Sequence, residues 1–62
     1  MENKKINLDL VGLNGNAFVI LGAFRKQAQK ENWSEEEIEA VMNEAQNDDY
    51  NHLLQTIMAH TK

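Results

Sequence analysis

The stretch WSEEEIEAVMNEAQN, residues 33–47, decides the fold of this chain. Ser34 is followed three residues later by Glu37, which is the spacing of a capping box at the start of a helix. The apolar positions after this cap recur at the spacing of one buried helix face, and they are Ile38, Val41, Met42 and Ala45. The stretch therefore predicts an amphipathic helix over residues 35–46.

The residues that follow predict a second helix, over residues 50–60. Asp48 or Asp49 can serve as its N-cap, because a carboxylate accepts hydrogen bonds from the free backbone N–H groups of a first turn. The apolar side chains form one stripe at helical spacing, made of Tyr50, Leu53, Leu54, Ile57 and Met58. His52 points away from this stripe.

The residues that precede the deciding stretch allow two interpretations. Asn14-Gly15 is a strong signal for a β-hairpin turn, but the resulting register sets Asp9 against Ile20, which is poor cross-strand chemistry. A helix over residues 16–31, capped by Asn14 or Asn16, places five apolar side chains on one face: Ala17, Phe18, Leu21, Phe24 and Ala28. Asn32 can end that helix in the left-handed conformation. The helix is favoured, and the hairpin remains the alternative.

Together these elements predict one small all-α domain over residues 1–62. It has three helices, at about 16–31, 35–46 and 50–60, and an extended N-terminal segment of which residues 1–5 are expected to be disordered. The expected core consists of Phe18, Leu21, Phe24, Trp33, Ile38, Val41, Met42, Leu53, Leu54, Ile57 and Met58.

The first helix carries apolar side chains on a second side, and a helix that is apolar on two sides needs two covers. These side chains are Val19, Ile20 and Ala23. Either the N-terminal residues Ile6, Leu8 and Leu10 fold back over this side, or a second copy or another protein covers it.

Composition narrows the classes of function. The chain has 62 residues, no cysteine and a net charge of −4, so neither a disulfide nor a thiolate metal site is expected. Residues 31–49 hold eight acidic side chains and no basic one, which disfavours direct binding of DNA or RNA because phosphate contacts need cations. No apolar run is long enough to span a bilayer, and no secretory leader is visible. The expected location is the cytoplasm.

The sequence contains no recognisable catalytic, cofactor or metal motif. The segment GLNG, residues 12–15, lacks the length and the Lys-Ser/Thr of a phosphate-binding loop. His52 and His60 are eight residues apart, without the four-residue spacing that places two metal ligands on one helix face. We therefore expect a protein that is not an enzyme and that binds neither a cofactor nor a metal.

Several separated blocks of the chain resemble a family of very small phage and prophage proteins. The matching blocks, which cover most of residues 9–60, are Gly15-Asn16-Ala17-Phe18, Gly22-Ala23, Trp33 before a capped helix, and Asp49-Tyr50-x-His52-Leu53-Leu54. Asp48 and Asn32 stand where this family usually has glycine. The resemblance implies a phage origin and a compact fold, and it implies no reaction.

Two functions follow as hypotheses. The first is a phage-derived acidic interaction protein that binds and modulates a host protein in the host cytoplasm, with a homodimer as an additional expectation. The second is an acidic mimic of nucleic acid that blocks a DNA-binding or defence protein. The candidate interaction surface for both consists of Val19, Ile20, Ala23, Glu36, Glu39, Glu44, Asp48, Asp49 and His52.

Overall fold

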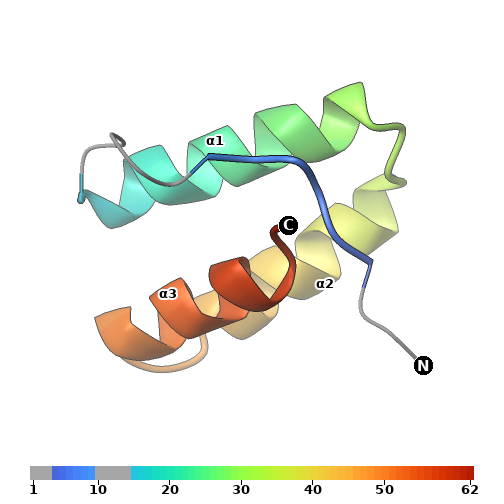
Figure 1. Cartoon of the computed structure of the whole chain (residues 1–62). Helices are drawn as coiled ribbons and strands as arrows, with labels where there is room; N and C mark the ends of the chain where they lie inside the picture. The colour runs from blue at the N-terminus through green and yellow to red at the C-terminus, as the bar shows by residue number, and fades with distance from the viewer. Residues whose placement is uncertain (1–3, 10–14) are drawn as a thin grey trace.

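The computed structural model describes residues 4–9 and 15–62, and these residues form three α-helices. Helix α1 spans Ala17–Lys30, α2 spans Glu35–Ala45 and α3 spans Tyr50–Ala59 (Figure 1). Each bound lies within one residue of its prediction, and the all-α three-helix fold is confirmed. The hairpin alternative is wrong, because residues 19–23, which would have formed its second strand, lie inside α1. The proposed turn residue Asn14 lies outside the described residues.

Each helix begins at a side chain that caps it. The Asn16 side chain accepts a hydrogen bond from the backbone N–H of Phe18, at 2.8 Å. Ser34 and Glu37 form the predicted capping box, with both reciprocal hydrogen bonds present. Asp49 caps α3. Such caps satisfy N–H groups that have no partner inside the helix, which is why these residues set the helix starts.

The link between α1 and α2 turns on Asn32. Its φ of 67° is the only positive value among the described residues other than glycine, and asparagine adopts this left-handed conformation more readily than most residues. The next residue, Trp33, then returns its backbone N–H to the carbonyl oxygen of Ala28 at 3.0 Å. The predicted left-handed stop is confirmed, and it brings Trp33 back against the end of α1.

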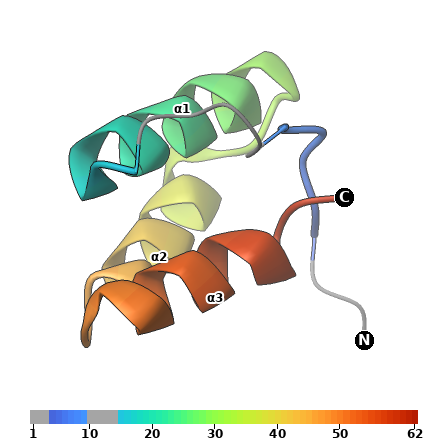
Figure 2. The same ribbon diagram turned by 60° about the vertical axis from the view of Figure 1, so that its left-hand side comes forward.

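The core lies where the three helices meet. Helices α2 and α3 run side by side, and α1 crosses above them (Figure 2). Phe24 and Trp33 pack edge to face in this core, with ring centroids 5.6 Å apart, a favourable arrangement for aromatic rings. The buried apolar residues are Ile6, Ile20, Leu21, Phe24, Ala28, Trp33, Ile38, Val41, Ala45, Leu53 and Ile57; Leu8, Ala17, Met42 and Leu54 pack partly buried against them.

Two residues that were predicted in the core lie on the surface instead. Phe18 is 82% exposed and Met58 is 60% exposed. Helix α1 buries Ile20, and a residue two positions away points roughly 200° around the helix from it, so Phe18 faces solvent. On α3 the buried face is centred on Ile57, and Met58 points roughly 100° away from it.

The second apolar side of α1 is partly covered by the chain itself. Ile20 is only 4% exposed, and it belongs to the same core cluster as Ile6, which is fully buried. Leu8 is half-buried against this cluster. The interpretation that the N-terminal residues fold back over α1 therefore holds for Ile6 and Leu8, whereas Leu10 lies outside the described residues.

The N-terminal segment, residues 4–9, is tied to the C-terminal end of the chain. Ile6 donates its N–H to the carbonyl oxygen of His60 at 2.8 Å and accepts from the N–H of Lys62 at 2.9 Å, which makes a short parallel bridge between Ile6 and Thr61. Both ribbon views place this segment beside the end of α3 (Figures 1 and 2).

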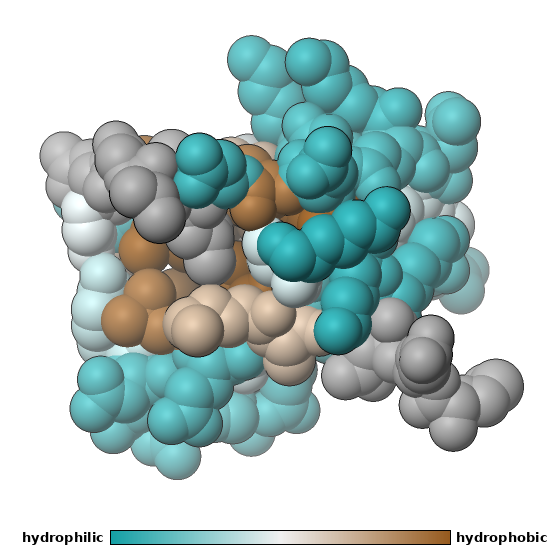
Figure 3. Space-filling view, viewed as in Figure 1, coloured by the Kyte–Doolittle hydropathy of each residue, from teal (hydrophilic) through white to brown (hydrophobic). Residues whose placement is uncertain are grey.

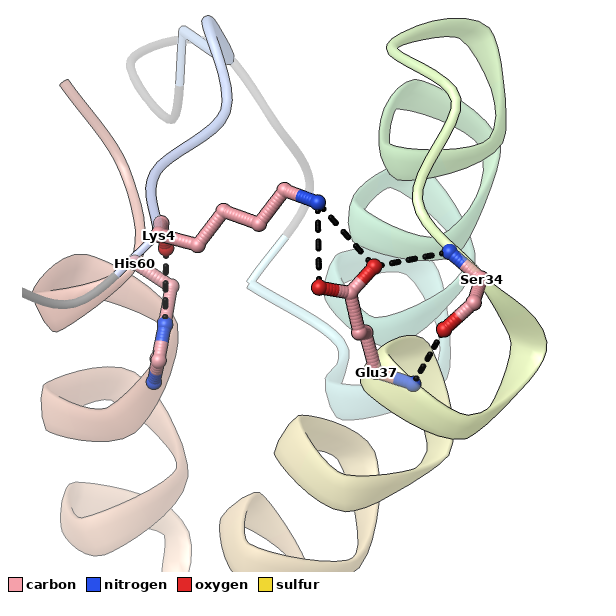
Figure 4. A network of polar contacts seen from close by, with 4 residues as sticks. All are labelled: Lys4, Ser34, Glu37 and His60. Atoms are coloured by element: carbon pink, nitrogen blue, oxygen red, sulfur yellow. Dashed lines mark hydrogen bonds and ion pairs between the residues drawn. The ribbon is translucent and has the colours of Figure 1, made fainter.

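Side chains reinforce this tie. Nδ1–H of His60 donates to the carbonyl oxygen of Lys4 at 3.0 Å, and Nζ of Lys4 lies 3.0 Å from both carboxylate oxygens of Glu37 (Figure 4). The Lys4 ammonium also lies 5.2 Å from the centre of the Trp33 ring. The pKa of Glu37 is lowered, mainly because its carboxylate accepts from the N–H of Ser34 and then because Lys4 is adjacent. One carboxylate thus serves both the α2 cap and the N-terminal segment.

Candidate interaction surface

The acidic residues proposed from the sequence fall into two groups. Glu44, Asp48 and Asp49 lie at the junction of α2 and α3, where their oxygens make hydrogen bonds. Oδ1 of Asp48 accepts from the N–H of Asp49 at 2.9 Å, and Oδ1 of Asp49 accepts from the N–H of His52 at 2.9 Å. These carboxylates have structural roles at a helix end.

Glu36 and Glu39 form the other group. Both are exposed on α2, and within residues 4–9 and 15–62 neither side chain makes a hydrogen bond or an ion pair. They are the acidic side chains of the proposed surface that the fold leaves open to a partner.

His52 joins α3 to the end of α2. Its Nε2 atom lies 2.8 Å from a carboxylate oxygen of Glu44 and 3.0 Å from the Glu44 carbonyl oxygen. The pKa of His52 is raised, first by the hydrogen bond to the Glu44 carboxylate and further by the nearby charge of Asp48. His52 is thus a titratable link between two helices, with its ring half-buried.

The apolar part of the proposed surface differs from the prediction. Ile20 is buried, so it is not available on the surface of a single chain, while Val19 is exposed and Ala23 is half-buried. The exposed apolar side chains at the starts of α1 and α3 form a different group, and the sequence pattern assigned one of them, Phe18, to the core.

This group, here called the apolar patch, consists of Phe18, Val19 and Tyr50. Phe18 and Val19 lie in the first turn of α1, and the hydroxyl of Tyr50 donates a hydrogen bond to the carbonyl oxygen of Gly15, just before that turn. Tyr50 is nevertheless 44% exposed. Single exposed apolar residues are common on protein surfaces, but here exposed Phe18 and Val19 begin α1, and exposed Tyr50 begins α3 and binds the residue before α1.

The residues that precede Tyr50 of the patch are acidic. Asp48 and Asp49 directly precede Tyr50, so acidic side chains border the patch. Figure 3 shows apolar side chains, brown to tan, gathered between α1 and α3, with hydrophilic residues above and below them.

The described residues contain no cluster of three or more histidine, cysteine or acidic side chains suited to a metal ion. Within the same residues, none of the helices combines the length and apolar character needed to cross a membrane. Comparisons of the chain with models of protein families, with curated proteins and with solved structures find no match. Function is therefore inferred from the chain's own residues.

Proposed function

We propose that this protein is a non-enzymatic, phage-derived interaction protein that binds and modulates a host protein in the host cytoplasm. The observation that carries the proposal is the exposure of Phe18, at 82%, next to exposed Val19 in the first turn of α1. Aromatic side chains are enriched in protein–protein interfaces, where a few of them supply most of the binding free energy. Phe18 is the anchor in this proposal.

The patch and its border define the chemistry of the partner. A pocket that accepts the Phe18 ring has to be apolar, because burial of an aromatic ring is driven by its removal from water. Asp48 and Asp49 beside the patch, together with a net charge of −4, favour a partner with lysine or arginine around that pocket, since complementary charge speeds association. The proposed partner therefore presents an apolar pocket with a basic rim.

Phe18→Asp tests this proposal. Phe18 is the second residue of α1, where an acidic side chain is compatible with the positive end of the helix, so the fold should persist. Ala40→Asp, at an exposed position of α2, makes the same change in charge elsewhere. We expect a partner isolated from host lysate to be retained by the unchanged protein and by Ala40→Asp, and to be lost by Phe18→Asp.

The same experiment distinguishes the alternative hypothesis, a nucleic-acid mimic. A mimic binds through Glu36 and Glu39, so Phe18→Asp would still retain its partner, whereas the double change Glu36→Gln and Glu39→Gln would not. The affinity of that partner would also fall steeply as salt increases. That result would overturn the role of Phe18. Failure to retain any specific partner at low or moderate salt would overturn the proposed function as a whole.

A further inference from the structure

Helix α3 exposes a line of apolar side chains that its own fold covers only in part. Tyr50, Leu54 and Met58 are four residues apart and therefore lie one above another on the helix surface. Tyr50 is 44% exposed, Met58 is 60% exposed and Leu54 is half-buried. This line, here called the α3 stripe, lies beside the buried face of the helix that holds Leu53 and Ile57.

The α3 helix is also the element without fixed charge. From Tyr50 to Ala59 it contains no aspartate, glutamate, lysine or arginine, and its exposed polar side chains are the amides of Asn51 and Gln55. By contrast, α2 carries five glutamates, and α1 carries three basic side chains. Depletion of charge together with exposed tyrosine and methionine is the composition of an interface core.

Absence of charge matters most when the partner is an identical molecule. In a two-fold dimer the same surface of both copies meets, so a charge close to the two-fold axis lies near its own duplicate. Two copies of a chain with a net charge of −4 would repel each other strongly through α2. Contact through α3 avoids this cost.

The spacing of the α3 stripe suits such a two-fold contact. In an antiparallel pair of helices centred on Leu54, Tyr50 of one copy lies against the partner's Met58, and the reverse contact is identical. Methionine sulfur makes favourable contacts with aromatic rings. The Asp49 side chains of the two copies are then about 15 Å apart along the axis, at 1.5 Å per residue, which exceeds the screening length of about 8 Å at physiological salt.

We propose that two copies of this chain form an antiparallel dimer through the α3 stripe, with Tyr50 of each copy against the partner's Met58. This dimer goes beyond the proposed function, because it uses α3 for self-association while Phe18 on α1 contacts another protein; Tyr50 belongs to both surfaces. A dimer would present two copies of Phe18 and so bind a clustered or symmetric target with greater avidity.

Sedimentation equilibrium of the full chain from micromolar to millimolar concentration tests this dimer. We expect the unchanged protein to approach twice the mass of one chain as concentration rises. Met58→Glu, at an exposed position, should keep the helical circular dichroism spectrum and remain at the mass of one chain throughout. Ala40→Glu, which adds the same charge on α2, should still form the dimer.

A mixture of two variants tests the antiparallel arrangement itself. Met58→Glu and Tyr50→Lys, each checked by circular dichroism to keep the helical fold because Tyr50→Lys loses the hydrogen bond to Gly15, should each remain monomeric alone. The equimolar mixture should form a one-to-one dimer, because the new carboxylate faces the new ammonium across the interface. The proposal is overturned if the unchanged protein stays monomeric, if Met58→Glu still dimerises, or if the mixture does not associate. Phe18→Asp should leave the mass unchanged, so failure of the dimer is distinguishable from failure of partner binding.

Discussion

Single side chains at the helix ends determine where the three helices begin and how the chain turns after α1. Ser34, Asp49 and Asn16 each satisfy backbone N–H groups at a helix start, and Asn32 supplies the left-handed turn that redirects the chain after α1. All of these contacts are local in sequence. His52 is different, because its ring connects α3 to Glu44 at the end of α2.

Stability should therefore depend on the protonation of His52. Its pKa in the folded protein is raised by Glu44, so the protonated ring is favoured by folding. The contribution is fully present below the unfolded value of about 6.5 and is lost as pH rises through the raised folded value. We expect the urea midpoint to fall as pH rises above about 6.5 and through the raised folded pKa of His52.

His52→Gln is the control for this prediction, since it removes the titration and should flatten the dependence on pH. Glu31 and Glu37 have lowered pKa values, the first mainly through the N–H of Asn7 and the second mainly through that of Ser34. Their contributions are present above the ordinary carboxylate value and are lost only as pH falls below it. An equal slope in His52→Gln would show that another group is responsible.

At the scale of the helices, the sequence periodicity predicted where each helix begins and ends. It predicted less well which of the apolar side chains are buried. The bounds of α2 and α3 follow from caps and spacing that are written locally in the chain. The exposure of Phe18 and Met58 does not, because α1 and α3 each have an apolar stripe wider than the face that a core this small can cover. Which edge stays uncovered depends on distant residues such as Ile6.

The sequence predicted the exposed acidic residues of the candidate surface but not its apolar residues. Glu36 and Glu39 are exposed as expected from their positions on an amphipathic helix. The start of α3 is tied to the residue before α1 by the hydrogen bond from Tyr50 to Gly15, which are 35 positions apart. Local patterns contain no information about that approach, and the sequence accordingly placed the apolar surface on Val19, Ile20 and Ala23.

Helix α1 contains one position where its stability can be increased. Gly22 lies in the middle of the helix, it is exposed, and an added Cβ would meet no atom within 4 Å. Glycine inside a helix costs about 0.5–1 kcal/mol relative to alanine. We expect Gly22→Ala to raise the free energy of unfolding by that amount, measured by urea denaturation.

The reciprocal change Ala40→Gly, at an exposed position inside α2, should lower the free energy of unfolding by a similar amount. A destabilising Gly22→Ala would mean that α1 needs the glycine for a contact beyond its own fold.

The whole molecule is closed by its N-terminal segment, which connects α1, α2 and the end of α3. Ile6 is fully buried in the common core, whereas the ion pair between Lys4 and Glu37 is about half exposed on both sides. Burial of apolar surface contributes more than an exposed ion pair. The segment is therefore held mainly by Ile6.

Ile6→Ala should cost about 2–5 kcal/mol, which is comparable to the whole stability of a core of this size, about 3–5 kcal/mol. We expect this variant to be largely unfolded by circular dichroism at room temperature. Lys4→Ala should cost less than about 1 kcal/mol and melt close to the unchanged protein. A larger loss of unfolding free energy for Lys4→Ala than for Ile6→Ala would show that the ion pair, and not Ile6, mainly holds the segment.

The bond between His60 and Lys4 joins residues 56 positions apart, and this has a consequence during translation. The N-terminal segment is synthesised before the three helices, yet its docking site is completed by residues 60–62, which follow α3. Ile6 therefore stays exposed to solvent while the helices that follow it in the chain form. A nascent chain therefore carries the aliphatic side chain of Ile6 uncovered until residues 60–62 are free to pair with it.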